Sequence, residues 1–459
     1  EKMRIAILAS LLGLAFAKTV PTCVVSDWSE GSACKGRCPQ VKGESWDAGK
    51  GEYLDEGRAM MKLMMDQKAQ EWAKMKACLA DGSCPEHAFV PTNQAAACVN
   101  GDAGGYPCRN IDMSSFTDFV GLGSVSSASG NDIWGWHDGD EDYAIVGLTT
   151  GSSFVRITDP ENVEVLGFLP TQTSSSTWRD MKVVNDHAFI VSEASGHGMQ
   201  VFDLTRLRGL SADSSRRFTV DAFYPGVGNS HNIASNPETN TVFIIGATRS
   251  GSGITTCSGG IHMIDVSDPK NPTFSGCFSS DGYSHDIECV VYRGPDSRYT
   301  GREICFGYNE NTLTLVDITD RSNPVQLSRT SYTGYRYTHQ GWLSSDHRWA
   351  LLDDELDESY STDKRTRTYI WNVESLTNPI MTEIFYSTET SIDHNMYIYN
   401  RANGDWVFQS NYEAGLRLLH FNTDTGKLTE YGYFDVFPSR TAANFEGTWS
   451  NYPDRKSVV

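Results

Sequence analysis

Residues 313–324 read LTLVDITDRSNP, a stretch of alternating apolar and polar residues that ends in a polar turn and an Asn-Pro pair. The same design recurs at 261–272 (IHMIDVSDPKNP) and 368–379 (TYIWNVESLTNP), and more weakly at 154–160 (FVRITDP). Alternation predicts a strand, and the Asn-Pro pair marks the turn that opens the next one. A design that returns about every fifty residues indicates a repeat architecture.

A second segment marks the start of each repeat and usually carries a histidine. The histidines are His137, His231, His285, His339 and His394, in the segments WHD, SHN, SHD, THQ and DHN. In the segment WRD at 178–180, Arg179 stands where the histidine would be, followed by Asp180. Residues 444–449 (NFEGTW), which contain Glu446, mark a seventh repeat. The sequence therefore predicts seven repeats with a polar side chain at one shared position.

Each repeat divides into four expected strands, which in the fourth repeat are 284–293, 303–309, 312–318 and 324–331. Four-stranded units at this spacing are typical of propeller blades. We therefore expect an all-β, seven-bladed β-propeller. Residues 116–126 are expected to close the ring as an outer strand of the last blade. The rest of that blade's second strand and its third strand would lie beyond Val459, so we expect the last blade to be truncated here.

Composition and charge narrow the class of protein. The chain has 459 residues, of which 39% are hydrophobic and 21% charged, as in a soluble globular protein. Its formal net charge of −20 argues against nucleic-acid binding, which needs a basic footprint. This negative charge favours solubility, cation binding or a saline exterior.

The first 17 residues have the pattern of a secretory signal peptide. A positive residue, Arg4, precedes the apolar run 5–14, and Ala15-Phe16-Ala17 forms a cleavage site before Lys18. The apolar run is too short for a membrane helix. We therefore expect a secreted or cell-surface protein with no transmembrane segment apart from the cleaved signal.

Eleven cysteines in a secreted chain imply disulfides. The spacing favours the pairs Cys98–Cys108, Cys257–Cys277 and Cys289–Cys305. The remaining set, whose pairing stays open, comprises Cys23, Cys34, Cys38, Cys78 and Cys84.

Residues 18–97 form a small Cys-rich region unlike the repeats, and residues 98–459 form the propeller. Residues 52–80 are expected to be an amphipathic helix whose apolar stripe packs against the main body. The stripe consists of Met61, Met64, Met65, Trp72, Met75 and Leu79. Whether this region is a separate domain or a plug on the propeller is left open.

The stretch from Cys98 to Val459 resembles the choice-of-anchor B family, whose members carry LVIVD-type repeats. The resemblance is carried by 98–110 (CVNGDAGGYPCRN), 131–138 (NDIWGWHD), 260–289, 337–358 and 444–449. The resemblance implies a propeller that is secreted or held at the cell surface. It says more about where the protein is found than about which reaction or ligand it serves. The N-terminal region 18–97 and the missing C-terminal anchor depart from the family pattern, and the expected truncation would account for the second departure.

A propeller places the start of each innermost strand and the end of the next strand on the same face. The side chains expected at that rim are His137, Arg179, Asp180, His231, His285, His339, His394 and Glu446, together with Glu193, Glu310, Glu355 and Glu413. Converging imidazoles suit a divalent transition metal, with His231, His285, His339 and His394 as candidate ligands. The carboxylates would orient them or act as bases, and Arg179 would suit an anionic group.

A structural reading competes with the metal site, because repetition in every blade is also what a shared packing role predicts. The departures at Arg179 and Glu446 count against a purely structural role. Nitrogen atoms that converge on one coordination sphere would favour metal, whereas histidines each bonded to their own blade would favour structure.

Two functions follow from these readings. The first is a monomeric binding module that presents its channel mouth to an extracellular ligand or protein partner. The second is a metal-dependent enzyme, a hydrolase or an oxidoreductase, whose substrate and metal the sequence does not name. The acidic run at 353–358 is expected to be a solvated turn, and His187, His197, His262, His347 and His420 are expected to be ordinary surface or strand residues.

Overall fold

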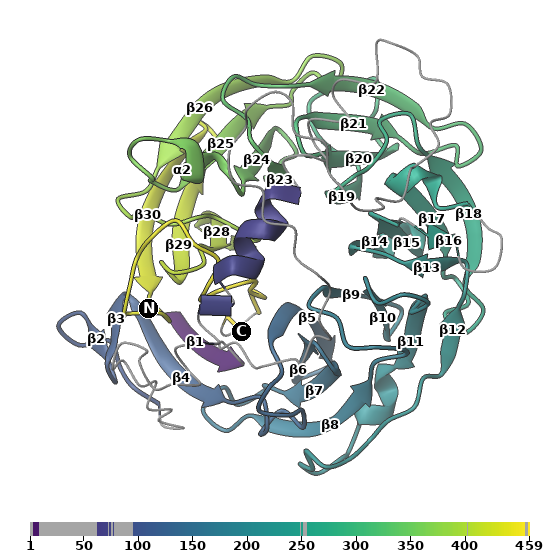
Figure 1. Ribbon diagram of the computed structural model, residues 1–459. Coiled ribbons are helices and arrows are strands. Elements are labelled where there is room, and N and C mark those ends of the chain that lie inside the picture. The colour runs from purple at the N-terminus through teal and green to yellow at the C-terminus, as the bar shows by residue number, and fades with distance from the viewer. Residues whose placement is uncertain are drawn as a thin grey trace, which may run out of the picture.

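Blades made of antiparallel strands form a ring around a central channel (Figure 1). The computed structural model describes residues 3–8, 62–71, 73–74, 77, 95–247, 249–250, 255–401, 403–454 and 458–459. Within these residues the chain forms six blades, so the all-β propeller prediction is confirmed. The expected total of seven blades stays a prediction.

The blades follow one another in chain order, and the first three have four strands each. The first blade consists of β5 (Gly130–Asp138), β6 (Glu141–Leu148), β7 (Gly151–Arg156) and β8 (Glu164–Pro170). The second consists of β9 (Arg179–Val184), β10 (His187–Ser192), β11 (Met199–Asp203) and β12 (Ala222–Tyr224). The third consists of β14 (Asn232–Asn236), β15 (Thr241–Ile245), β17 (Ile261–Asp265) and β18 (Thr273–Phe278).

The next three blades continue the ring. The fourth blade consists of β19 (Asp286–Val291), β20 (Glu303–Tyr308), β21 (Leu313–Asp317) and β22 (Val325–Thr330). The fifth consists of β23 (Thr338–Leu343), β24 (Trp349–Asp354), β25 (Arg367–Asn372) and β26 (Ile380–Tyr386). The sixth consists of β27 (Met396–Arg401), β28 (Gly404–Ser410), β29 (Leu416–Asn422) and β30 (Lys427–Phe434). The outer edge of the last of these carries the hairpin β2 (Asp102–Ala103) and β3 (Tyr106–Arg109).

Smaller elements decorate the ring. They are the two-stranded sheet β13 (Val227–Asn229) and β16 (Arg249–Ser250), the short helix α2 (Asp357–Tyr360), and the 3₁₀ turns η1 (Leu204–Leu207), η2 (Pro237–Thr239) and η3 (Cys257–Gly259). Residues 62–71 form a helix that crosses the opening of the ring in Figure 1. Met64 of this helix is buried among propeller side chains, which confirms for Met64 that the apolar stripe packs against the main body.

The apolar core lies between neighbouring blades. One cluster, for example, joins Ile145 and Phe154 of the first blade to Ile190 and Phe202 of the second. Because each sheet buries both faces against its neighbours, strands such as β20 and β24 are buried at every residue. The blades therefore hold one another in a fixed ring, and the starts of the innermost strands are brought to one end of the channel. We call this end the channel mouth.

A two-stranded sheet lies between the sixth blade and the first. It pairs β1 (Met3–Leu8) in parallel with β4 (Ile111–Thr117), and the Val458 amide donates to the Arg4 carbonyl oxygen at 3.1 Å. The outer strand predicted at 116–126 is therefore wrong in position, because β4 ends at Thr117. Beyond it the Asp118 carboxylate accepts a hydrogen bond from the Gly121 amide at 2.6 Å and turns the chain.

The three proposed disulfides, Cys98–Cys108, Cys257–Cys277 and Cys289–Cys305, are all present and confirm those predictions. The other five cysteines lie outside the described residues, as do residues 9–17 of the proposed signal peptide. Among the residues described, no helix has the length and apolar character of a membrane span.

Candidate metal centre at the channel mouth

Four histidines from four consecutive blades form a row at the channel mouth. The ring centroids are separated by 4.5 Å from His231 to His285, 4.4 Å from His285 to His339, and 4.4 Å from His339 to His394. Each histidine lies at or just before the start of an innermost strand, so the repeat itself brings the rings together. The prediction that these four side chains would meet is therefore met by the geometry.

The row borders a hollow with an empty volume of about 280 Å³, part of which is open solvent. Its lining consists of Asp132, Trp178, Arg179, His231, Asn232, His285, His339, His394, Asn395 and Trp449.

The Nδ1 atom of every histidine in the row is bonded to the protein. The Nδ1 of His231 donates to Glu193 Oε1 at 2.6 Å and that of His339 to Asp353 Oδ1 at 3.0 Å. The Nδ1 of His285 donates to the His339 carbonyl at 2.9 Å, and that of His394 to the Trp449 carbonyl. Since carbonyl and carboxylate oxygens only accept from these rings, the proton is on Nδ1 and the lone pair of a neutral ring is on Nε2.

Burial keeps the rings of His285, His339 and His394 neutral. It lowers the pKa of His285 and His339 well below the ordinary histidine value, and neighbouring imidazoles lower it further. For His394, burial lowers the pKa to about 4 although Glu355 acts in the opposite direction. Neutral imidazoles with a free Nε2 are the form that binds metal ions.

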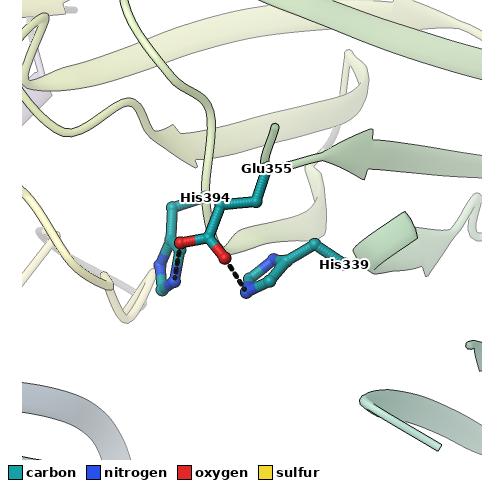
Figure 2. A group of neighbouring side chains, drawn as sticks. All are labelled: His339, Glu355 and His394. Carbon is teal, nitrogen blue, oxygen red and sulfur yellow. Dashed lines mark ion pairs between the residues drawn. The ribbon is translucent and has the colours of Figure 1, made fainter. Parts of the chain in front are cut away.

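Glu355 lies between two of the histidines, as Figure 2 shows. Its Oε2 lies 3.7 Å from His339 Nε2 and its Oε1 lies 3.6 Å from His394 Nε2. One ligand atom from each of these three buried residues lies within 4.8 Å of the other two. We call His339, Glu355 and His394 the mouth triad.

Glu355 is ionised although it is fully buried. Burial alone would raise its pKa, but Lys68 and then His394 outweigh that effect, and the pKa is lowered. Glu355 Oε1 accepts hydrogen bonds from Lys68 Nζ at 2.7 Å and from the Tyr412 hydroxyl at 2.5 Å. Glu355 Oε2 accepts none from the described residues. The carboxylate therefore keeps one oxygen free beside His339.

Arg179 lines the hollow, but its guanidinium is turned into the protein. Nε donates to the Leu148 carbonyl at 3.0 Å, NH2 to Thr171 Oγ1 at 2.7 Å, and NH1 to His197 Nε2 at 3.0 Å. Burial lowers its pKa to about 10, and burial followed by Arg179 lowers that of His197 to about 3. Arg179 was expected to bind an anionic group with its guanidinium, but the guanidinium nitrogens donate to acceptors within the protein instead.

His137 is not at the mouth, contrary to the prediction. It lies near the end of β5, whereas the mouth is formed by strand starts, and Asn131 and Asp132 are at that end. The His137 ring bonds Asp142 at 2.5 Å and shares a second group of potential ligands with Asp142 and Asp454. In this blade, Asn131 stands where most of the other blades have the histidine, six residues before His137.

Glu446 and Glu413 are buried together beside Arg440 rather than in the row. Arg440 donates to both carboxylates, and burial followed by Glu413 raises the pKa of Glu446 to about 8. Residues 444–449 contain an isolated bridge between Thr448 and Tyr412 but no strand, so the start of a seventh innermost strand at Glu446 is wrong. Trp449 reaches the hollow instead.

Two further predicted carboxylates have local roles. The Asp180 Oδ1 pairs with Lys182 Nζ at 2.7 Å, and its Oδ2 accepts from the Ile233 amide at 3.0 Å. The backbone of Glu310 pairs with Thr338, next to His339.

The acidic run at 353–358 is buried, so the expectation of a solvated turn is wrong. Carboxylates of this run accept hydrogen bonds from donors inside the protein. Asp354, for instance, accepts from the Tyr332 hydroxyl at 2.8 Å and from the Tyr337 amide at 2.7 Å. Glu355 reaches the mouth because β24 ends at Asp354, directly before it. Of the five remaining histidines, His187, His197, His262, His347 and His420, none lines the hollow.

Sequence reasoning missed Lys68, Tyr412 and Asp353 as parts of the site. Lys68 follows Met64 by four residues and therefore shares its helix face, which was a usable signal. Asp353 lies opposite the histidine in the neighbouring strand, but nothing in its sequence context separates it from other buried acids.

Neither a protein-family model nor a curated protein sequence matches this chain. Solved structures with similar folds include a putative 6-phosphogluconolactonase from Bacteroides fragilis (10% identity, 69% of this chain, 85% of that one, TM-score 0.46). A periplasmic gluconolactonase from Pseudomonas aeruginosa is 12% identical (69% and 85% covered, TM-score 0.44). A β-propeller domain from Myceliophteria thermophila is 11% identical (71% and 90% covered, TM-score 0.41). These likenesses concern the fold and leave the function of this chain open.

Proposed function

We propose that this protein is a binding propeller whose site is the channel mouth, and that the mouth triad holds a divalent transition-metal ion. The observation that carries the proposal is the grouping of His339, Glu355 and His394 ligand atoms within 4.8 Å of one another. Imidazole and carboxylate ligands together suit zinc, iron, manganese or copper.

The bonding of each nitrogen supports a ligand role beside a structural one. A histidine that only tied blades together would use one ring nitrogen for that bond, and this role does not explain why the second ring nitrogen of both His339 and His394 faces one carboxylate. Here Nδ1 makes the structural bond and Nε2 faces Glu355. Asp353 behind His339 gives the carboxylate–histidine pairing that orients metal ligands.

Isothermal titration of chelator-stripped protein with Zn²⁺ tests the proposal. We expect one ion per chain, lost in His339→Ala and in His394→Ala and retained in His420→Ala, whose ring lies outside the mouth. His137→Ala is the second control, because it disrupts the other potential group. Binding that survives both triad substitutions, or no binding at all in folded protein, would refute the metal centre.

A metal-dependent enzyme is the second candidate, and one observation favours it. The triad supplies three ligands, and a catalytic ion needs three protein ligands and an open position. Cobalt-substituted protein tests this directly. An open position predicts that azide changes the visible spectrum, whereas a spectrum indifferent to azide would leave only the binding role.

We also propose that the protein is a secreted or cell-surface member of the choice-of-anchor B type with seven blades. The LVIVD-like strands β17, β21 and β25 and the three disulfides support this assignment. Strand β4 and residues 444–454 would then fill the seventh position, between the sixth blade and the first, together with β1 in a chain that retains residues 1–17. Its partner would be an extracellular ligand or protein that meets the mouth. A structure of protein purified from the culture medium tests both points, and a ring closed by six blades would contradict the count.

A further inference from the structure

Lys68 lies in a cage of aromatic rings closed by a carboxylate. Its Nζ is 2.7 Å from Glu355 Oε1, and it lies 5.0 Å from the ring centroids of Phe445 and Trp449 and 5.8 Å from that of Tyr412. The Lys68 and Glu355 side chains are 2% and 0% exposed. Ring faces attract a cation within about 6 Å, and more strongly when water is excluded. This arrangement recognises an ammonium group by charge, hydrogen bonding and ring contact together.

The cage belongs wholly to the propeller. The Tyr412 hydroxyl donates to Glu355, and the Thr448 amide donates to the Tyr412 carbonyl at 3.0 Å. Gly447, with φ of 92°, permits this close approach, because a Cβ there would lie 2.3 Å from the Tyr412 carbonyl oxygen. The rings of Phe445 and Trp449 pack against that of Tyr412, with centroids 5.4 and 6.2 Å away.

The helix at 62–71 enters this cage along one narrow face. Met64 is buried against Tyr337, Leu356 and Phe445, and Lys68 lies one turn further on. The opposite face is exposed, where Lys62 pairs with Asp66 at 2.5 Å. Met64 and Lys68 are the two buried side chains of the described part of the helix, and Met65 is partly buried beside them. An element with so few buried contacts opens at a low free-energy cost.

We propose that the channel mouth is a recognition site for a primary alkylammonium group, and that helix 62–71 is an internal occupant that presents Lys68 to it. The competing ligand is a lysine side chain of a partner or a small alkylamine, which share the same chemistry. A primary ammonium is preferred over a quaternary one, because only the former has an N–H group for Glu355. The proposal goes beyond metal binding, and of the mouth triad it uses only Glu355.

Binding of n-butylammonium, which has the length of a lysine side chain, tests the cage by calorimetry in a chelating buffer. We expect Lys68→Ala to bind it at least about tenfold more tightly than the wild type, because a tethered occupant no longer competes. Lys62→Ala is the matched control and should equal the wild type. The double variant Lys68→Ala/Glu355→Gln should lose the binding, and butyltrimethylammonium should bind more weakly than n-butylammonium. Folded Lys68→Ala that binds no better than the wild type would overturn the proposal.

Two further measurements distinguish the sources of the ligand and the role of the helix. Nα-acetyl-lysine methylamide is used in place of n-butylammonium as a probe for a lysine side chain of a partner protein. If it binds, the natural ligand can be such a lysine. If only n-butylammonium binds, the natural ligand is a small amine. Hydrogen exchange at residues 62–71 of the wild type should become faster as n-butylammonium displaces the helix. Unchanged exchange at saturating amine would refute the internal occupant. Because chelator removes metal throughout, failure of the metal centre leaves each of these results intact.

Discussion

The nitrogen atoms of single histidines decide between a structural and a ligand role at the mouth. In His339 the two roles are divided, since Nδ1 is held by Asp353 and Nε2 faces Glu355. Asp353 Oδ1 also accepts from the Gln340 amide at 3.0 Å, so it fixes both the ring and the strand that carries it. Asp353 is therefore a positioning residue for the triad.

Replacing Asp353 by alanine should weaken metal binding without removing a ligand. The loss of such a supporting acceptor costs about 10- to 100-fold in metal affinity, because the ring can turn or change tautomer. Asp353→Asn keeps an acceptor oxygen and should lose less. Competition titration with a metal indicator measures both, and Asp346→Asn on a distant turn of the same blade is the control. Equal affinities in all four proteins would contradict the role of Asp353.

Glu446 gives a prediction for pH. Its folded-state pKa, raised by burial and then by Glu413, is about 8 against an ordinary value of 4.5. The folded protein thus holds a proton that the unfolded chain releases. Stability from this group is complete below pH 4.5 and is lost as the pH rises to 8, by at most about 1.4 kcal/mol per pH unit. Glu446→Gln cannot ionise, so its unfolding free energy relative to the wild type should rise from pH 5 to pH 8. Urea unfolding at several pH values measures this, and a constant difference would contradict it.

At the scale of elements, alternation of apolar and polar residues predicted the strands well. The four strands expected in the fourth repeat correspond to β19, β20, β21 and β22 to within two residues at each end. The pattern works because each strand has one register that buries its apolar side chains between blades.

The misplaced elements share a physical cause. β5 has nine residues and a register shift between Gly130 and Ile133. It is long enough to contain two polar residues, Asn131 near its start and His137 near its end. Sequence alone does not tell which of them meets the mouth. Residues 353–358 have the composition of a surface turn, and only contacts from neighbouring blades, such as Tyr332 on Asp354, reveal that they are buried.

The disulfide between β19 and β20 joins residues that lie directly opposite in the ladder, Cys289 and Cys305. It closes a loop with a sequence separation of 16, which restricts the unfolded chain. Replacing both cysteines by alanine should lower the free energy of unfolding by about 2–4 kcal/mol. Chemical unfolding measures this, with the reduced wild type for comparison. An unchanged unfolding midpoint would show that the ladder alone holds these strands.

At the scale of the whole molecule, the ring explains how distant residues meet. The four histidines could be predicted to share the mouth because repetition places every innermost strand in the same orientation. Lys68 could not, because its helix lies outside the repeats and its contact with Glu355, 287 residues away, is a tertiary event. The sequence therefore predicts the polar mouth but not what covers it.

The sheet β1–β4 links the predicted signal peptide to the closure of the ring. If residues 1–17 are removed on secretion, the chain begins at Lys18 and β4 loses its partner β1. We expect the secreted form to have the mass of a chain starting at Lys18, and its β4 amides to exchange faster than those of protein that retains residues 1–17. Intact mass spectrometry and hydrogen exchange measure these, and a secreted chain that still contains Met3–Leu8 would contradict the prediction.

The metal centre is tested most directly by anomalous diffraction from crystals of Zn²⁺-loaded protein. We expect one anomalous peak at the channel mouth, about 2.0–2.2 Å from His339 Nε2, His394 Nε2 and a Glu355 oxygen. A peak beside His137 instead, or no peak at the mouth in fully loaded crystals, would contradict it.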